Sequence, residues 1–168
     1  MLSNRNDLKV GIDLHGVITA NPKYFSKFSL EAKKRGFEIH ILTGSSSTDA
    51  KEKLKKYNII YDHLFSILDY FSKQNKVEHF KDGNFHVDER LWDSAKANYS
   101  NNNHIDFHID DKEQYGQGML AAFFHYNHAE QKCTIKGPAK YHIFYITQDI
   151  GKTFNLIERL IRRYKKCK

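Results

Sequence analysis

The chain has 168 residues, of which 40% are hydrophobic and 28% charged, a composition typical of one globular domain with an ordinary buried core. No run of 18 apolar residues suits a membrane-spanning helix, and Met1 to Asp7 lack the apolar segment of a signal peptide. Cys133 and Cys167 are too few and too far apart for a disulfide framework or a zinc site. We therefore expect a cytoplasmic protein with reduced thiols and no membrane partner.

The formal net charge is +7, and much of the excess lies close to the C-terminus. The basic residues there are Arg159, Arg162, Arg163, Lys165, Lys166 and Lys168. Such a segment can attract nucleic acid or an anionic membrane surface. Cations also suit the C-terminal end of a helix dipole, and we favour this second interpretation of a solvated helix end. The general excess of positive charge favours an anionic substrate.

Strand and helix patterns alternate along the chain. Apolar runs predict strands at 8–13, 37–42, 63–68, 105–110, 119–125 and 141–147. Helices are expected at 22–35, 48–57, 88–100 and 149–165, with Pro22 in the first turn of the first one. The stretch 69–87 is less regular, and Asp82-Gly83-Asn84 within it suits a hairpin turn. We predict a single α/β domain over 1–168 with a small excursion near 69–87, built as a three-layer α/β/α sandwich with a Rossmann-like, mainly parallel sheet and a basic C-terminal helix.

Polar residues close three of the predicted strands. The first strand ends on Asp13 ahead of a turn at Gly16, the second ends on Thr43, and the strand at 105–110 ends on Asp110 and Asp111. Because the carboxyl ends of parallel strands meet at one edge of a sheet, where ligands bind, these side chains should lie together. Two or three carboxylates beside a hydroxyl indicate a magnesium site that handles phosphate.

These residues resemble the four motifs of the haloacid dehalogenase-like hydrolases, a superfamily of aspartate-nucleophile phosphatases. The first motif reads Asp13-Leu14-His15-Gly16-Val17-Ile18-Thr19, and the second reads Leu42-Thr43-Gly44-Ser45. Lys96 stands for the third motif, and the pair Asp110-Asp111 stands for the fourth. The resemblance covers residues 8 to 125. It departs from the family at His15, where the phosphatases usually have a second aspartate.

The resemblance implies a role for each motif. Asp13 is the expected nucleophile, and the aspartyl-phosphate that it forms is then hydrolysed by water. Mg²⁺ is expected on Asp13, the backbone carbonyl of His15 and Asp110, with Asp111 as a ligand or as the residue that orients a water ligand. The phosphate is expected to bind Thr43, Gly44 and Lys96, because unpaired backbone N–H groups at a strand-to-helix junction suit its oxygens.

The pattern around Lys96 supports its assignment independently. Trp92 and Tyr99 lie four residues before and three residues after it, so all three share one helix face. A solvated lysine would avoid such a face, which predicts that Lys96 is buried. Lys73 and Lys76 are the weaker alternatives.

His15 leaves three interpretations open. The imidazole can be the working acid/base near neutral pH, it can mark a slow enzyme with a long-lived aspartyl-phosphate, or the site can bind phosphate without turnover. The last case would make the chain a non-catalytic binding or regulatory module. A receiver-like domain also uses an acidic pair, a hydroxyl and a lysine, but places the pair at the end of its first strand.

The substrate is less defined than the chemistry. No insertion is long enough for a cap domain, so we expect an open site like that of the capless members of the superfamily, which accept bulky substrates or use a partner as a lid. The expected substrate is a small-molecule phosphate ester. Tyr24, Phe25, Tyr70 and Phe71 either stack on a nucleotide base or belong to the core. We expect structural roles for His79, His86, His104 and His108, because they share no clean metal-ligand spacing.

Overall fold

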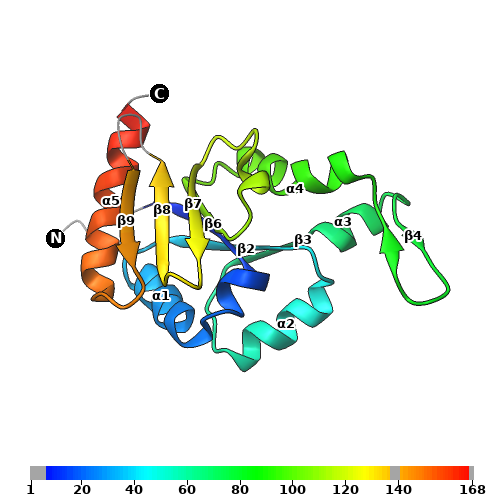
Figure 1. Ribbon diagram of the computed structural model, residues 1–168, viewed down its shortest axis with the longest axis horizontal. Helices are drawn as coiled ribbons and strands as arrows, with labels where there is room; N and C mark the ends of the chain where they lie inside the picture. Colours follow the sequence, from blue (N-terminus) through cyan, green and yellow to red (C-terminus); the bar gives the residue numbers. More distant parts are fainter. Residues whose placement is uncertain (1–6, 137–140, 167–168) are drawn as a thin grey trace.

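A seven-stranded sheet forms the centre of the computed structural model, which describes residues 7–136 and 141–166 (Figure 1). The strand order is β3-β2-β1-β6-β7-β8-β9. The first five strands in this order are parallel, and β8 and β9 are antiparallel to their neighbours. The bounds are β1 Lys9–Asp13, β2 Glu38–Thr43, β3 His63–Ser66, β6 Phe107–Asp110, β7 Ala122–Asn127, β8 Lys132–Lys136 and β9 Tyr141–Tyr145. The predicted α/β class with a mainly parallel sheet is thus confirmed.

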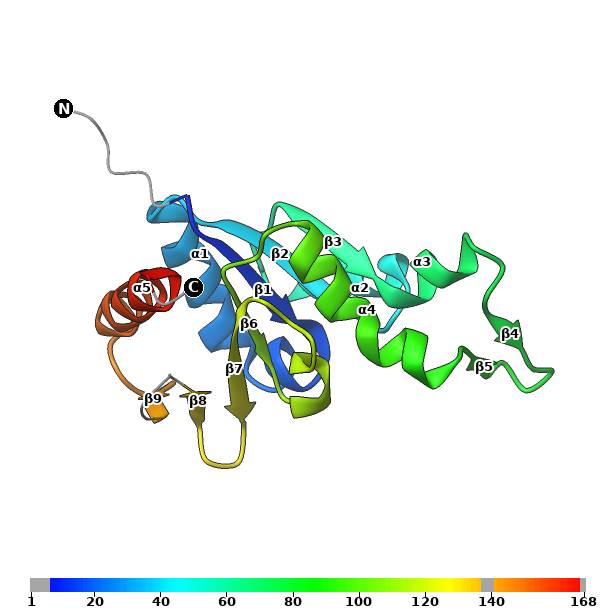
Figure 2. The same ribbon diagram turned by 90° about the horizontal axis from the view of Figure 1, so that it is seen from above.

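Five α-helices flank this sheet in the described part of the chain. They are α1 Pro22–Lys34, α2 Ser47–Lys56, α3 Ile67–Ser72, α4 Glu89–Asn102 and α5 Ile150–Lys166. In Figure 2, α1 and α5 lie together on one side of the strands and α4 lies on the other. Phe28 of α1 and Phe154 of α5 are in ring contact, with centroids 4.6 Å apart.

The two faces of the sheet differ in chemistry. Val10 and Ile12 of β1 and Phe107 and Ile109 of β6 are buried in the main core with residues of α1 and α5. Because side chains alternate along a strand, the residues between them lie on the face that α4 covers. On β6 these residues are polar, and both His108 and Asp110 are fully buried. The face beneath α4 therefore holds the buried charges of the molecule.

The ends of the first two helices show how local sequence sets the bounds. Asn21 begins α1 by accepting a hydrogen bond from the backbone N–H of Tyr24, and Pro22 occupies the first turn as predicted. Helix α2, expected over 48–57, spans Ser47–Lys56. Ser46 is its cap, since its hydroxyl accepts from the backbone N–H of Asp49 at 3.2 Å.

The sequence-based elements differ from the structure in several places, and helix α3 was not predicted. The strand expected over 63–68 ends at Ser66, whose side chain caps α3. The strand expected over 119–125 begins three residues later, at Ala122. Strand β8 was not predicted at all, because Lys132–Lys136 is short and carries lysine at both ends.

The segment between β3 and α4 extends away from the sheet (Figure 1). It contains α3 and a hairpin of β4 (Glu78–His79) with β5 (Phe85–His86), and the turn between these strands holds Asp82-Gly83-Asn84 as predicted. At the other end of the molecule, Lys165 of the basic helix forms an ion pair with Asp106 at 2.6 Å. Cys167, Lys168 and the first six residues, on which some sequence predictions fall, lie outside the described residues. Within the described ranges, no helix has the length and apolar character to cross a bilayer.

Candidate active site

The carboxyl ends of three adjacent strands carry the predicted polar residues. β1 lies between β2 and β6, with Asp13 in register with Leu42, and Ile12 in register with both Ile41 and Ile109. This registration places Asp13, Thr43 and Asp110 at the same edge of the sheet, each as the last residue of its strand. All three are buried. The juxtaposition predicted from the strand ends is present.

Lys96 of α4 connects the two strand-end carboxylates. Its ammonium donates to Asp13 Oδ1 at 2.5 Å and to Asp110 Oδ2 at 2.6 Å. The lysine side chain is only 2% exposed, as its shared face with Trp92 and Tyr99 predicted. The alternatives Lys73 and Lys76 are exposed on the excursion. Burying an ammonium is costly unless it is paired, and here two carboxylates raise the pKa of Lys96 in spite of its burial.

The acidic residues form a group that fits a divalent cation. One carboxylate oxygen from each of Asp13, Asp110 and Asp111 lies within 4.8 Å of the others. Asp13 Oδ2 is buried and has no hydrogen-bond partner among the described residues. A buried polar atom without a partner is unusual, and oxygen donors of this kind are the ligands that Mg²⁺ prefers. The residues present therefore fit the predicted magnesium ion.

The protein shifts the pKa values of Asp13 and Asp110 in opposite directions. Burial raises the pKa of Asp13 to about 7, against the attraction of Lys96, and the negative charge of Asp110 adds to this effect. Burial also acts on Asp110, but the hydrogen bond from His108 and the charge of Lys96 outweigh it and lower its pKa to about 2. The two carboxylates share one ammonium, and Asp13 therefore keeps its proton to a higher pH than an ordinary aspartate does.

His108, for which we expected a structural role, contacts the site. It lies two residues before Asp110 on β6, and its Nε2 lies 3.0 Å from Asp110 Oδ2. Since a carboxylate only accepts, the imidazole must donate through Nε2. Burial lowers the pKa of His108, which favours the neutral ring. His108 therefore holds the Asp110 carboxylate in position by a hydrogen bond within β6.

The turn after β1 depends on Gly16. Residues Leu14–Ile18 form a wide turn that the hydrogen bond from Thr19 N–H to the Leu14 carbonyl closes at 2.9 Å, and within it Gly16 has a non-helical φ of +86°. Its backbone N–H donates to Thr19 Oγ1 at 3.1 Å. A Cβ atom at Gly16 would fall 2.4 Å from a carboxylate oxygen of Asp111. Glycine is needed here both for the left-handed backbone and for the close approach of the fourth motif to the first.

Thr43 and Gly44 occupy the junction between β2 and α2. Thr43 Oγ1 accepts from the backbone N–H of Ser45 at 3.2 Å and lies 3.1 Å from the Ser45 hydroxyl. A Cβ atom at Gly44 would fall 2.8 Å from Cζ2 of Trp92. Gly44 thus leaves room for the indole of α4, a contact that the sequence did not predict. Trp92 Nε1 in turn donates to the hydroxyl of Tyr115 at 3.3 Å.

His15 has a cationic partner that the sequence did not reveal. The ammonium of Lys53 donates to His15 Nε2 at 2.8 Å, and His15 Nδ1 lies 3.5 Å from Thr43 Oγ1. Burial and then the charges of Lys53 and Lys96 lower the pKa of His15. The imidazole is therefore neutral, with its Nε2 lone pair occupied. Helix α2 carries four lysines, and nothing in their spacing distinguishes Lys53.

Tyr115 was also missed. It belongs to the short helical turn η2 (Glu113–Gly116), and the Lys96 ammonium lies 4.3 Å from the centre of its ring. This distance suits a cation–π interaction. Lys96 is therefore enclosed by two carboxylates and an aromatic face, which fixes its position. The turn follows the fourth motif so closely that its role could have been suspected from its position alone.

The aromatic residues that were candidates for base stacking belong mainly to the core. Tyr24 and Phe25 are buried on α1, and the ring of Phe25 packs edge-on against Tyr126 at 5.5 Å. Phe71 is buried in a smaller cluster with Ile67. Of the four, only Tyr70 is exposed. The core alternative therefore holds for three of these residues.

No protein-family model, curated protein or solved structure matches this chain.

Proposed function

We propose that this chain is a magnesium-dependent phosphomonoester hydrolase of the haloacid dehalogenase-like superfamily, acting through an aspartyl-phosphate on Asp13. The observation that carries the proposal is the buried contact of Lys96 with both Asp13 and Asp110 at the carboxyl ends of parallel strands. Buried, mutually perturbed charged groups concentrate at functional sites. The strand ends of an open parallel sheet are also where ligands bind.

Asp13 is the nucleophile in this proposal. Lys96 donates to Oδ1 and Oδ2 has no partner among the described residues, so one carboxylate oxygen can attack while the other would face the ion. The bond from the attacking oxygen to phosphorus forms as the bond from phosphorus to the ester oxygen breaks, and the leaving oxygen takes a proton from solvent water. Water then attacks phosphorus and gives up a proton to solvent, which restores the carboxylate and releases inorganic phosphate.

The surrounding residues bind the phosphate and balance its charge. The hydroxyls of Thr43 and Ser45 and the backbone at Gly44 supply polar contacts beside the nucleophile, and Lys96 supplies positive charge. Asp13, Asp110, Asp111 and the backbone carbonyl of His15 would hold Mg²⁺, which offsets the repulsion between a carboxylate and a phosphate dianion when bound. His108 keeps Asp110 oriented.

The wider assignment belongs to the same proposal. The proposal includes the three-layer α/β/α sandwich expected from the alternation of strands and helices, and the cytoplasmic location expected from the two cysteines and the missing signal-peptide pattern. Polar residues on the α4 face of β6 and apolar residues on its other face support two helical layers. The substrate class is a small phosphate ester, with nucleotides among the compounds to be tested.

One observation favours a second function, a phosphate-binding or regulatory module without turnover. A general acid must carry a proton to the leaving oxygen. The His15 pKa is lowered and its Nε2 accepts from Lys53, so the free protein holds His15 unprotonated at that atom. In this alternative the site binds phosphate, but the step that expels the ester oxygen lacks a proton donor.

A phosphatase screen tests both functions. Purified protein is assayed on p-nitrophenyl phosphate, nucleoside monophosphates and sugar phosphates, with Mg²⁺ and with excess chelator. We expect hydrolysis only with Mg²⁺, and a loss of at least about a thousandfold in Asp13→Asn, the scale typical of a lost nucleophile. Asp82→Asn on the exposed hairpin is the matched control and should keep full activity.

Two results would contradict the hydrolase. Activity that persists in chelator would exclude the magnesium site. A native protein that is inert on every ester, but gains hydrolysis in His15→Asp, would establish the phosphate-binding module instead. Retention of inorganic phosphate by that inert native protein, measured by calorimetry, completes the distinction.

A further inference from the structure

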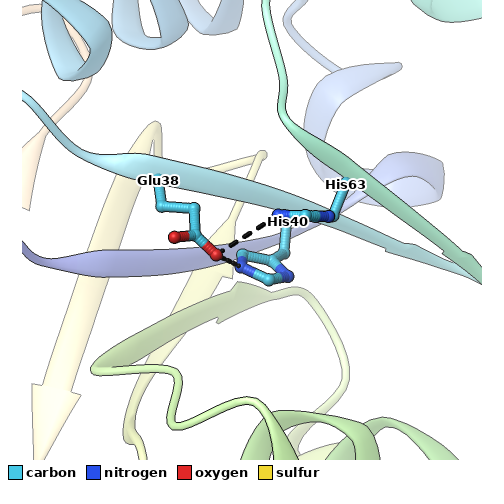
Figure 3. Close-up of side chains that lie close together, drawn as sticks. All are labelled: Glu38, His40 and His63. Atoms are coloured by element: carbon cyan, nitrogen blue, oxygen red, sulfur yellow. Dashed lines mark hydrogen bonds and ion pairs between the residues drawn. The ribbon is translucent and has the colours of Figure 1, made fainter.

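A second polar cluster lies at the opposite ends of the same strands. Glu38 and His40 are two residues apart on β2, so they share one face of the sheet. His63 of β3 is the register partner of His40. The three side chains converge from these two strands (Figure 3). Glu38 begins β2 and Thr43 ends it, so the cluster is separate from the acidic site.

The ligand atoms are already close to one another. Glu38 Oε1 lies 2.7 Å from His40 Nε2 and 3.3 Å from His63 Nε2, and one ligand atom from each residue lies within 4.8 Å of the others. Tetrahedral ligands at zinc bond lengths of about 2.0–2.1 Å are about 3.4 Å apart. The Glu38–His63 separation matches this value, and a small movement of the Glu38 side chain would open the other.

We propose that Glu38, His40 and His63 form a zinc-type transition-metal site with three protein ligands and a fourth position open to solvent. Two imidazole nitrogens and one carboxylate oxygen are a donor set that suits Zn²⁺. Mg²⁺ prefers oxygen ligands, so the acidic site and this cluster select different ions. The inference does not depend on the phosphatase proposal.

Tyr99 gives His40 the support that a metal ligand needs. Its hydroxyl lies 2.9 Å from His40 Nδ1. Without metal, His40 Nε2 donates to the Glu38 carboxylate, so the tyrosine hydroxyl donates to Nδ1. With metal on Nε2, the proton moves to Nδ1 and the same hydroxyl accepts it. Ligating histidines are oriented by such partners on their second nitrogen.

One neighbouring charge would compete with the ion for the Glu38 carboxylate. The competing cation is Lys9, whose ammonium lies 3.2 Å from Glu38 Oε1. Lys9 is one-third exposed and can turn to solvent when an ion replaces it.

Two of the three proposed ligands are exposed to solvent, so an ion can reach the cluster. The His40 side chain is 2% exposed, whereas Glu38 is 37% and His63 is 52% exposed. One ligand is thus fixed in the protein and two can adjust at the surface. Because β3 is the edge strand of the sheet, a shared ion would fasten it to β2.

Cobalt titration is the direct test, because Co²⁺ substitutes for Zn²⁺ and absorbs visible light strongly when four-coordinate. The full chain is titrated with Co²⁺ under saturating Mg²⁺, which occupies the acidic site. We expect one equivalent of Co²⁺ to bind, and added Zn²⁺ to remove the absorption. His63→Ala and Glu38→Gln should each weaken binding at least about tenfold, since even the loss of an orienting partner costs about 10–100-fold.

Three further variants separate the ligands from their surroundings. Tyr99→Phe should weaken Co²⁺ binding roughly tenfold, and Lys9→Met should strengthen it by removing the competing ammonium. His86→Ala, an exposed histidine on the hairpin, is the matched control and should change nothing. Zn²⁺ should also raise the Tm of the native chain but not that of His63→Ala.

The proposal is overturned if no saturable Co²⁺ binding occurs below millimolar concentration. It is also overturned if binding survives both His63→Ala and Glu38→Gln while these variants unfold cooperatively like the native chain. Loss of the Co²⁺ signal in Asp13→Asn with retention in His63→Ala would place the ion at the acidic site and reject this one.

Discussion

The carboxylate of Asp111 lies directly over the Cα atom of Gly16, so the first and fourth motifs touch through a position that has no side chain. The two residues are 95 positions apart in the sequence and belong to the turns that follow β1 and β6. A methyl group on Gly16 would displace one of these turns. The relative position of Asp13 and Asp111 therefore depends on this single glycine.

Gly16→Ala should reduce both stability and Mg²⁺ affinity. A φ of +86° penalises any Cβ, and the contact of 2.4 Å adds a clash. Gly83 has almost the same φ, +85°, and a methyl group there would meet nothing within 4 Å, so Gly83→Ala isolates the backbone penalty of about 1 kcal/mol. Chemical denaturation of both variants should show a larger loss for Gly16→Ala. Equal losses would mean that Asp111 moves away freely.

Asp13→Asn should stabilise the protein at pH 8 while it abolishes hydrolysis. The pKa of Asp13 is raised from 3.8 to about 7, so its contribution to stability is present below about pH 4 and is lost as the pH rises to about 7. The gain in the variant should therefore be absent near pH 4 and present above pH 7. The free energy of unfolding, measured between pH 4 and pH 8, should diverge from that of the native chain with increasing pH.

Asp110→Asn should change the free energy of unfolding in the opposite direction from Asp13→Asn. The pKa of Asp110 is lowered to about 2, so its stabilising contribution is present above about pH 4 and is lost as the pH falls toward 2. Its replacement leaves Lys96 with a single carboxylate and removes the acceptor of His108. We expect destabilisation at neutral pH. A stabilised Asp110→Asn would show that the two carboxylates had been assigned the wrong way round.

Lys53→Met should raise the pKa of His15. The variant removes one positive charge and the hydrogen bond to Nε2, whereas burial, the largest cause of the lowered pKa, remains. The imidazole proton resonances of His15, followed by NMR during a pH titration, report the change. Lys51→Met, an exposed lysine on the same helix, is the control. If His15 is the general acid, Lys53→Met should also extend activity toward higher pH.

Gly44→Ala should be visible in tryptophan fluorescence. Trp92 is the only tryptophan in the chain, and a Cβ at Gly44 would lie 2.8 Å from its Cζ2 atom. Displacement of the indole should shift its emission and disturb the hydrogen bond to Tyr115. Trp92→Phe lacks the Cζ2 atom of indole and should restore the stability lost in Gly44→Ala. A double-mutant cycle without coupling would refute the contact.

The part of the fold that the sequence predicted is the part with strong local patterns. β1 and β2 are apolar runs with a polar last residue, and Asn21-Pro22 marks the beginning of α1. β8 escaped prediction because its stability comes from pairing with β7 and β9 on both sides, which no local pattern records. Ser66 was read as strand because its role as the cap of α3 depends on the next turn.

The residues of the candidate site also fall into those that local sequence predicted and those that depend on packing. Asp13, Thr43 and Asp110 were predictable because strand ends of a parallel sheet converge, and Lys96 because it shares a helix face with aromatic residues. Lys53 was not, since the contact with His15 depends on how α2 packs against the turn after β1. The cluster of Glu38, His40 and His63 was missed because the pairing of β2 with β3 sets its register.

The hydrogen bond from Lys96 to Asp13 joins residues 83 positions apart in the sequence. The hydrogen bond from the backbone N–H of Lys9 to the Asp106 carboxylate, beside the pairing of β1 with β6, joins residues 97 positions apart. Contacts of such long sequence separation form late in folding, because the intervening chain must first be ordered. Contacts within α1 and α2 close far shorter loops at lower entropic cost. A chain in which α4 has not yet packed against the sheet would hold Asp13 without its counter-charge. Integrity of the acidic site is consequently a reporter of completed folding.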